Sequence, residues 1–245
     1  MGSEATPILD AVGIRKQFGA LAVLDGVDFA VGDGAAVGIV GPNGAGKTTL
    51  LNVLSGALRP NAGRVSFRGR DVTRRSASAR CRLGVGRAHQ IPRPFGGMTV
   101  FENVHVGAAL GAGLRGGSAY DASTAALELC GLLDQANRRA ESLGLLDRKR
   151  LELARAVATD PAILLLDEIG AGLTDAEAVE LVATVNELRS REIAIVWIEH
   201  IVHVLIQGVE RLVCMDAGRV IADGRPDEVM REAAVIDAYL GSAIA

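Results

Sequence analysis

Two groups of residues in this chain have the types and spacing that phosphate chemistry requires. The first is the stretch 41–49, which fits the pattern G-x-x-x-x-G-K-[ST] at every fixed position. Its glycines let backbone N–H groups close around a polyphosphate, and the helix N-terminus that follows favours an anion. Lys47 would reach the β- and γ-phosphates, and the Thr48 hydroxyl would ligate Mg²⁺. The stretch therefore predicts a nucleoside-triphosphate site rather than an ordinary glycine-rich turn. Its members are Gly41, Pro42, Asn43, Gly44, Ala45, Gly46, Lys47, Thr48 and Thr49.

The second group is a pair of carboxylates at the end of an apolar run. Residues 163–166 are all apolar, and Asp167 and Glu168 follow them directly. Asp167 suits the coordination shell of Mg²⁺, whereas Glu168 points to the other side of the strand and could polarise a water for attack on the γ-phosphate. The alternative is a strand that merely ends in polar residues, and the phosphate loop makes that alternative much the weaker one.

Two polar side chains that follow other apolar runs are further candidates. His200 comes after the run 193–198 and could hydrogen-bond the γ-phosphate and the water. Gln90 follows the run 83–86 and is a candidate for sensing Mg²⁺ and the attacking water. A lone histidine or glutamine is more often structural. These two residues are candidates only because the phosphate loop and the two carboxylates are present as well.

The elements that must position these residues form a strand–helix–strand unit. The runs 162–166 and 193–198 are short and continuously apolar, which is typical of strands buried on both faces of a parallel sheet. Between them, Thr174 and Glu177 have the spacing of a capping box ahead of a helix. Such a unit would bring the ends of its two strands to one edge of a sheet.

The rest of the chain divides into a core and an inserted lobe. We expect antiparallel strands at 27–31 and 64–68, a hairpin around 216–218, and an α/β core made of residues 6–90 and 160–245. Residues 91–159 are predicted to form an inserted helical lobe. Within it, the Gly/Ala-rich stretch 107–117 is predicted to be a loose connection, and 122–133 an amphipathic helix.

Composition limits the classes of function. The net charge of −3 and pI of 5.9 argue against a general polyanion binder. Cys81, Cys130 and Cys214 have no metal-like spacing, which favours reduced thiols in a cytosol. We expect no secretory leader and no membrane span, because Glu199 and His200 interrupt the longest apolar stretch. The mean hydropathy of +0.27 is high for a soluble protein, and a buried partner interface would account for it.

The order and spacing of these motifs resemble the ATP-binding subunits of ABC transporters over nearly the whole chain. Three strings are similar to those of the branched-chain amino-acid importer ATPases: Gln90 followed by 98–103, the segment 150–156 and the ending 238–241. The resemblance implies a P-loop NTPase fold with a RecA-like core, an antiparallel β part and a helical lobe. It also implies ATP and Mg²⁺ as cofactors.

The resemblance further implies roles for single residues and for partners. Phe18 would stack on adenine, and the catalytic residues would be Glu168 as general base, His200 as switch, Lys47 and Gln90. The metal ligands would be Thr48, Gln90 and Asp167. Two ATP-binding subunits, alike or merely related, would sandwich two ATP molecules and drive transmembrane permease subunits that a substrate-binding protein supplies. The site of action would be the cytoplasmic face of the membrane.

The chain departs from the family at its signature loop. Where the family has L-S-G-G-Q, this chain has residues 143–147. Leu145 and Leu146 replace the permissive glycines, and Asp147 would face the γ-phosphate of the opposite subunit. We therefore expect a weak or altered contribution in trans, for which Ser142 and Gly144 would partly substitute. In addition, Ile169 replaces a usual proline and Thr174 a usual aspartate, and Thr174 is expected to serve chiefly as a helix cap.

Two other functional classes fit the sequence less well. A soluble ABC-type ATPase acting on nucleic acid or ribosomes usually has two cassettes or a long coiled-coil insert, and this chain has neither, nor a net positive charge. A phosphate-loop kinase would leave Glu168 and His200 without a role. Nine arginines between residues 64 and 93 are either a docking surface for the permease or a solvated basic face, and the sequence leaves both open.

Overall fold

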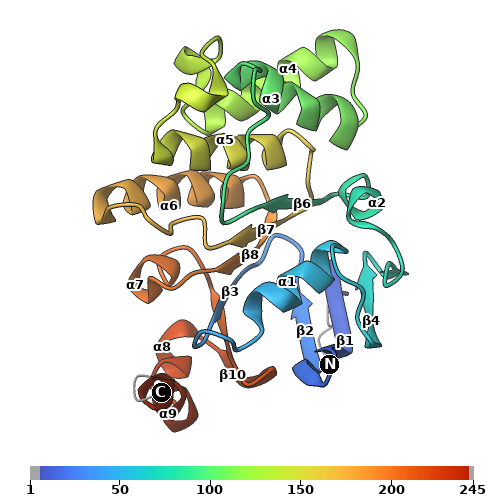
Figure 1. The fold of residues 1–245 in the computed structure, drawn as a ribbon, viewed down its shortest axis with the longest axis vertical. Helices are drawn as coiled ribbons and strands as arrows, with labels where there is room; N and C mark the ends of the chain where they lie inside the picture. Colours follow the sequence, from blue (N-terminus) through green and yellow to red (C-terminus); the bar gives the residue numbers. More distant parts are fainter. Residues whose placement is uncertain (1–5, 243–245) are drawn as a thin grey trace.

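The computed structural model describes residues 6–242, which form two β-sheets and a set of helices (Figure 1). The larger sheet has the strand order β10-β9-β3-β8-β7-β6, and the smaller one the order β2-β1-β4-β5. In the larger sheet β6, β7, β8, β3 and β9 are parallel to their neighbours, while β10 returns antiparallel to β9. The smaller sheet is antiparallel throughout. The predicted mixed α/β architecture with an antiparallel part is therefore confirmed.

The strands are β1 (Leu9–Phe18), β2 (Leu21–Val31), β3 (Ala36–Val40), β4 (Ala62–Phe67), β5 (Arg70–Asp71), β6 (Val85–Ala88), β7 (Ile163–Asp167), β8 (Ala194–Ile198), β9 (Arg211–Asp216) and β10 (Arg219–Gly224). The α-helices are α1 (Lys47–Ser55), α2 (Ala77–Cys81), α3 (Val100–Val106), α4 (Gly116–Leu129), α5 (Leu145–Val157), α6 (Asp175–Ser190), α7 (Val202–Leu205), α8 (Pro226–Val229) and α9 (Ala233–Ser242). A π-helical turn η1 (Gly107–Gly111) and two 3₁₀ turns, η2 (Leu133–Gln135) and η3 (Ala140–Ser142), complete the fold.

The central strands β3, β7 and β8 of the larger sheet are buried on both faces, which is why they are almost entirely apolar. Leu164 and Leu166 of β7 join the core that contains residues of α3, α4, α5 and α6. Ile163 and Leu165 point the opposite way, into a second core shared with α1 and the antiparallel sheet. This alternation follows from the two-residue period of a strand.

The predicted strand–helix–strand unit is confirmed. β7 and β8 are parallel neighbours with α6 between them in the chain, and Asp167 lies opposite Ile198. Thr174 caps α6 as predicted, since its hydroxyl accepts from the Glu177 N–H and the Glu177 carboxylate accepts from the Thr174 N–H. The hairpin around 216–218 is confirmed by β9 and β10. Cys81, Cys130 and Cys214 are free thiols.

Helices α3, α4 and α5 lie together at the top of Figure 1, away from the chain ends. They lie in the sequence between β6 and β7, which pair directly with each other. This arrangement suits an inserted helical lobe, although the boundaries 6–90, 91–159 and 160–245 stay a prediction. In residues 6–242 no helix has both the length and the apolar character needed to cross a bilayer.

The prediction of a loose connection at 107–117 was right only for residues 112–115, and the predicted helix bounds of 122–133 were wrong. α3 continues into the π-helical turn η1, and α4 begins at Gly116 and ends at Leu129. Gly107 lies so close to α5 that an added Cβ would be 2.5 Å from the carbonyl oxygen of Arg155. This glycine therefore serves a close helix contact, which local composition does not reveal.

Candidate functional site

The phosphate loop connects β3 to α1, and the helix that follows it was predicted. Residues 43–49 line a cavity of about 240 Å³, and Val23 and Glu168 complete its walls. The hairpin turn between β9 and β10 contacts the loop, because the Gly218 N–H donates to the Ala45 carbonyl (3.1 Å). The N-terminus of α1 opens onto this cavity, so the backbone is arranged for an anion.

Lys47 is buried against its own loop. Its ammonium donates to the carbonyl oxygens of Gly41 (2.6 Å) and Pro42 (2.9 Å). Burial lowers the pKa of Lys47, and the nearby Glu168, Cys214 and Asp167 act in the opposite direction. The carboxylates thus favour the charged ammonium, the form that would pair with phosphate.

Asp167 is a buried carboxylate with two partners. The Thr48 hydroxyl donates to its Oδ1 (3.3 Å), and the Arg87 guanidinium donates to its Oδ2 (2.9 Å). Adjacent ligands of an octahedral Mg²⁺ ion lie about 3 Å apart, since each bond is about 2.0–2.1 Å long. The Thr48 and Asp167 oxygens therefore fit neighbouring ligand positions on such an ion.

The other two predicted polar residues, Gln90 and His200, contact the carboxylate of Glu168. The side-chain amide of Gln90 donates to Oε2, and His200 Nε2 lies 2.7 Å from Oε1. Glu168 has a positive φ of 47°, unusual for a residue with a side chain, and its N–H donates to the Ile198 carbonyl (2.9 Å). Such strained backbone is often found at functional sites. The structure thus brings two predicted catalytic residues, Gln90 and His200, to the carboxylate of a third, Glu168, although their chemical roles stay predictions.

Three side chains of α5 hydrogen-bond the backbone of residues 89–93, the segment that contains Gln90. The Lys149 ammonium donates to the Gln90 carbonyl (2.6 Å) and lies 3.4 Å from the Glu168 carbonyl. Arg155 donates to the Arg93 carbonyl (2.8 Å). Burial raises the pKa of Glu152, while Arg155 and hydrogen bonds from the backbone of residues 89 and 93 oppose the shift. We call Lys149, Glu152 and Arg155 the α5 clamp.

Glu199 positions the backbone that follows Glu168. It is buried, and its Oε1 accepts from the Gly170 N–H (2.6 Å) and from the Trp197 indole N–H (3.3 Å). Burial raises the pKa of Glu199, and these hydrogen bonds act against the rise. Trp197 is also buried and belongs to the core.

Phe18 is not among the residues that line the loop cavity. It ends β1, is half exposed, and has the Lys16 ammonium 5.1 Å from its ring centroid. Its stacking on adenine stays a prediction.

The atypical signature loop leads directly into α5. Gly144 precedes the helix, and Asp147 lies in its first turn. The Asp147 carboxylate accepts from Gln135 (2.9 Å) and lies 3.5 Å from Arg150. The Ser142 hydroxyl donates to the Arg139 carbonyl within its own turn (2.8 Å). The partners of Asp147 reduce the repulsion expected towards a phosphate, and the weak contribution in trans stays a prediction.

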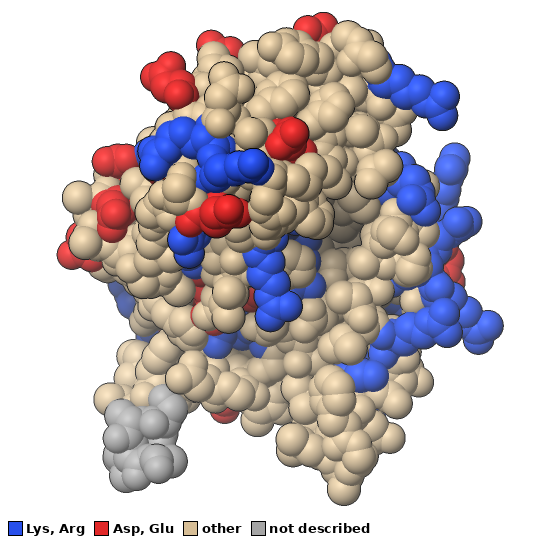
Figure 2. Space-filling model, turned by 45° about the horizontal axis from the view of Figure 1, so that its top comes forward, with Lys and Arg blue, Asp and Glu red and all other residues tan. Residues whose placement is uncertain are grey.

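Two of the nine arginines between 64 and 93 fit neither interpretation of the basic stretch. Arg80 is fully buried and donates to the last carbonyls of α1, those of Val53 and Leu54, and burial lowers its pKa to about 10. Arg87 is the partner of Asp167. Figure 2 shows lysine and arginine side chains along its right-hand edge, on the side where Figure 1 has α2 and β4.

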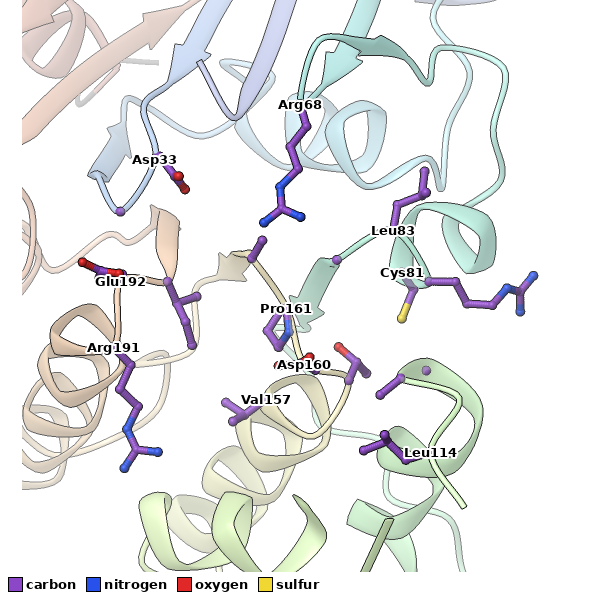
Figure 3. A pocket seen from close by; sticks show the side chains of 18 of the residues that line it. Asp33, Arg68, Cys81, Leu83, Leu114, Val157, Asp160, Pro161, Arg191 and Glu192 are labelled. Carbon is purple, nitrogen blue, oxygen red and sulfur yellow. The ribbon is translucent and has the colours of Figure 1, made fainter. Parts of the chain in front are cut away.

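A cavity of about 850 Å³ lies at the opposite edge of the larger sheet (Figure 3). It is lined by residues that precede β3, β6, β7 and β8, among them Asp33, Asp160 and Glu192, and by Arg68. Charges of both signs surround it, and it has no lining residue in common with the phosphate-loop cavity.

Sequence reasoning missed several residues of the site. In the sequence, Arg87 stands only within the basic stretch and Glu152 only within the family string 150–156, and no pattern singled out Lys149. Lys149 and Glu152 are charged residues on the buried face of an amphipathic helix. Charged residues are rarely buried without a partner, so their place on that face was the sequence signal that could have identified them.

Comparison with known proteins gives consistent similarities. Residues 24–171 match the family described as "ABC transporter", and residues 219–245 match "Branched-chain amino acid ATP-binding cassette transporter". The chain is 36% identical to the high-affinity branched-chain amino acid transport ATP-binding protein LivG of Escherichia coli, with 97% of this chain and 99% of that protein covered. It is 35% identical to the corresponding protein BraF of Pseudomonas aeruginosa over the same shares.

Two solved structures agree over almost the whole chain. A nucleotide-free ATP-binding cassette from an ABC transporter superposes with a TM-score of 0.87 at 30% identity, covering 96% of this chain and 99% of that one. A cassette in its ADP conformation gives 0.89 at 31% identity, covering 97% and 100%. The fold is therefore that of the P-loop ATP-binding cassettes, with a helical lobe beside the core.

Proposed function

Because this chain belongs to the ABC transporter family of ATPases, we propose that it is the ATP-hydrolysing subunit of an importer for branched-chain or other small amino acids. The observation that carries the mechanism is the convergence of Gln90 and His200 on Glu168, beside the phosphate loop. The names of the relatives LivG and BraF support the class of substrate.

In the proposed reaction, residues 41–49 bind the phosphates of ATP, and Lys47 pairs with the β- and γ-phosphates. Thr48, Asp167 and Gln90 would hold Mg²⁺, which would supply positive charge against the phosphoryl oxygens. Glu168 takes the proton of the attacking water as general base. His200 and Gln90, which contact the Glu168 carboxylate, hold it in place and sense the γ-phosphate.

We propose a groove beside Gln90 as the docking site for a cytoplasmic segment of the permease. The groove has a volume of about 530 Å³ and runs between α1, α2 and the helical lobe, where Phe95 and Leu110 are exposed apolar side chains. His89 lines it one residue before Gln90. A permease segment bound there would press on the backbone of Gln90. The α5 clamp would pass this movement to α5, the helix that follows the signature loop.

The assembly proposed around this chain is a sandwich of two ATP-binding subunits at the cytoplasmic face of the membrane. The permease subunits would supply the membrane-spanning part, and a substrate-binding protein would deliver the amino acid to them. ATP binding would close the dimer, hydrolysis would reopen it, and the permease would follow.

Replacing the proposed base tests this function in the purified transporter. In Glu168→Gln we expect ATP binding to persist and turnover to fall by about 10²- to 10⁴-fold, because a carboxamide cannot accept the water proton. The variant should also form a stable ATP-dependent dimer in gel filtration. Glu187→Gln, which alters an exposed carboxylate on α6, is the matched control. Equal turnover in Glu168→Gln and wild type would exclude Glu168 as the base.

The substrate class needs a separate experiment. The complex purified from native membranes should contain permease subunits, and its ATPase rate in liposomes should rise with a branched-chain amino acid and its binding protein. Stimulation by nucleic acid instead, with no membrane protein co-purifying, would favour the soluble class of ABC-type ATPase.

A further inference from the structure

The C-terminal helix contacts the phosphate loop at its first residue. The Gly41 N–H donates to the hydroxyl of Tyr239, 3.0 Å away, which lies on α9 (Ala233–Ser242). The ring of Tyr239 packs against the core that contains Val40, Cys214 and Val235. Burial raises the pKa of the Tyr239 hydroxyl, and the bond from Gly41 opposes the rise. This hydroxyl is thus a neutral group at physiological pH, fixed by the packing of its ring.

Gly41 is bonded at both of its backbone groups, and the second bond leads to Lys47. Its carbonyl accepts from the Lys47 ammonium (2.6 Å), while its N–H donates to Tyr239. A continuous path therefore runs from the Tyr239 hydroxyl through one residue to the lysine proposed to pair with the phosphates. The hydroxyl and the ammonium are thus linked through the backbone of Gly41.

Position 41 has no room for a side chain, so only glycine fits there. The residue has a φ of +141°, and an added Cβ would lie 2.0 Å from the Met215 carbonyl oxygen. The backbone of Gly41 is therefore packed directly against β9. Its N–H is bonded to Tyr239, which lies in the segment 219–245 that matches the branched-chain amino-acid cassette family.

We propose that Tyr239 is a positioning residue of the phosphate loop, which holds Gly41 and through it Lys47 in the geometry that binds ATP. The tail of the chain thereby sets the affinity for nucleotide. This inference rests on the proposed assignment of residues 41–49 as the phosphate site. Tyr239 is not among the residues that line the phosphate-loop cavity.

The test removes only the hydroxyl. Tyr239→Phe keeps the packed ring, so we expect the melting temperature without nucleotide to change little. A neutral hydrogen bond contributes enough to weaken the affinity for ATP by about two- to tenfold when it is lost. The measurement is titration of the purified chain with a fluorescent ATP analogue and Mg²⁺. Tyr120→Phe, at an exposed tyrosine of the helical lobe, is the matched control and should leave the affinity unchanged.

A double-mutant cycle with Lys47→Ala tests the path through the lysine. If Tyr239 acts through Lys47, the loss of affinity caused by Tyr239→Phe should disappear in the Lys47→Ala background. Unchanged affinity in Tyr239→Phe alone, or an equal loss in both backgrounds, would overturn the inference. If Lys47→Ala alone left the affinity intact, the phosphate-site assignment would fail instead, so the two failures are distinguishable.

Discussion

The buried ion pair between Arg87 and Asp167 gives a prediction whose size follows from the geometry. The two groups are 2.9 Å apart, and their side chains are only 11% and 5% exposed. The Arg87 guanidinium also donates to Asn52 (2.6 Å) and Ser55 (3.1 Å). Arg87→Met keeps much of the length of the side chain and removes its charge and its donors.

The expected loss of stability is large. Removal of one partner of a buried pair costs about 3–5 kcal/mol, because the other charge stays buried without compensation. Thr48 still donates to Asp167, so we expect the lower end, about 3 kcal/mol. For a chain of this size each kcal/mol lowers the melting temperature by about 2–4 °C, which gives a decrease of about 6–12 °C.

The assay is calorimetric unfolding, with and without Mg²⁺ and an ATP analogue. Because Mg²⁺ bound to Asp167 would replace the missing positive charge, the Mg-nucleotide complex should stabilise Arg87→Met more than it stabilises wild type. Arg82→Met, at an exposed arginine of the same stretch, should stay within about 0.5 kcal/mol of wild type. A loss below about 1 kcal/mol in Arg87→Met would refute the reasoning on the pair, and equal stabilisation by Mg-nucleotide would refute Asp167 as a metal ligand.

Two further predictions concern the residues around Glu168. Burial raises the pKa of Glu199 above its ordinary 4.5, so the folded protein binds this proton more tightly than the unfolded chain does. Wild type should therefore lose stability relative to Glu199→Gln as the pH rises through the folded-state pKa. Urea unfolding at pH 5 and pH 8 measures this, and a pH-independent difference would contradict it. Lys149→Met should lower kcat by about ten- to a hundredfold through misplacement of Gln90 and Glu168, with the affinity for ATP unchanged. Lys149→Arg retains donors and should restore most of the rate, whereas full activity of Lys149→Met would show that the contact with Gln90 is dispensable.

The parts of the site that the sequence revealed are those whose residue types are dictated by chemistry within a few neighbouring positions. The phosphate loop and the pair Asp167 and Glu168 are of this kind, because each follows one strand directly. The capping box at Thr174 was also visible, since all of its partners lie within one turn of helix.

The parts that escaped prediction depend on contacts between distant segments. Tyr239 meets Gly41 from the far end of the chain, and Lys149 reaches Gln90 from another element. The prediction of a loose connection failed at residues 107–111 for a related reason, because packing of Gly107 against α5 overrode its weak local preference for helix. Spacing along the chain contains no information about such contacts.

The attachment of the hairpin turn to the phosphate loop has a consequence for biosynthesis. Gly218 donates to Ala45 and accepts from the Asp25 N–H, so the turn joins two segments that leave the ribosome much earlier. Contacts of such long range form late and slow the folding of a domain. A nascent chain that ends before this turn should therefore lack a well-formed nucleotide pocket, even when its loop, both carboxylates and the histidine have all been synthesised.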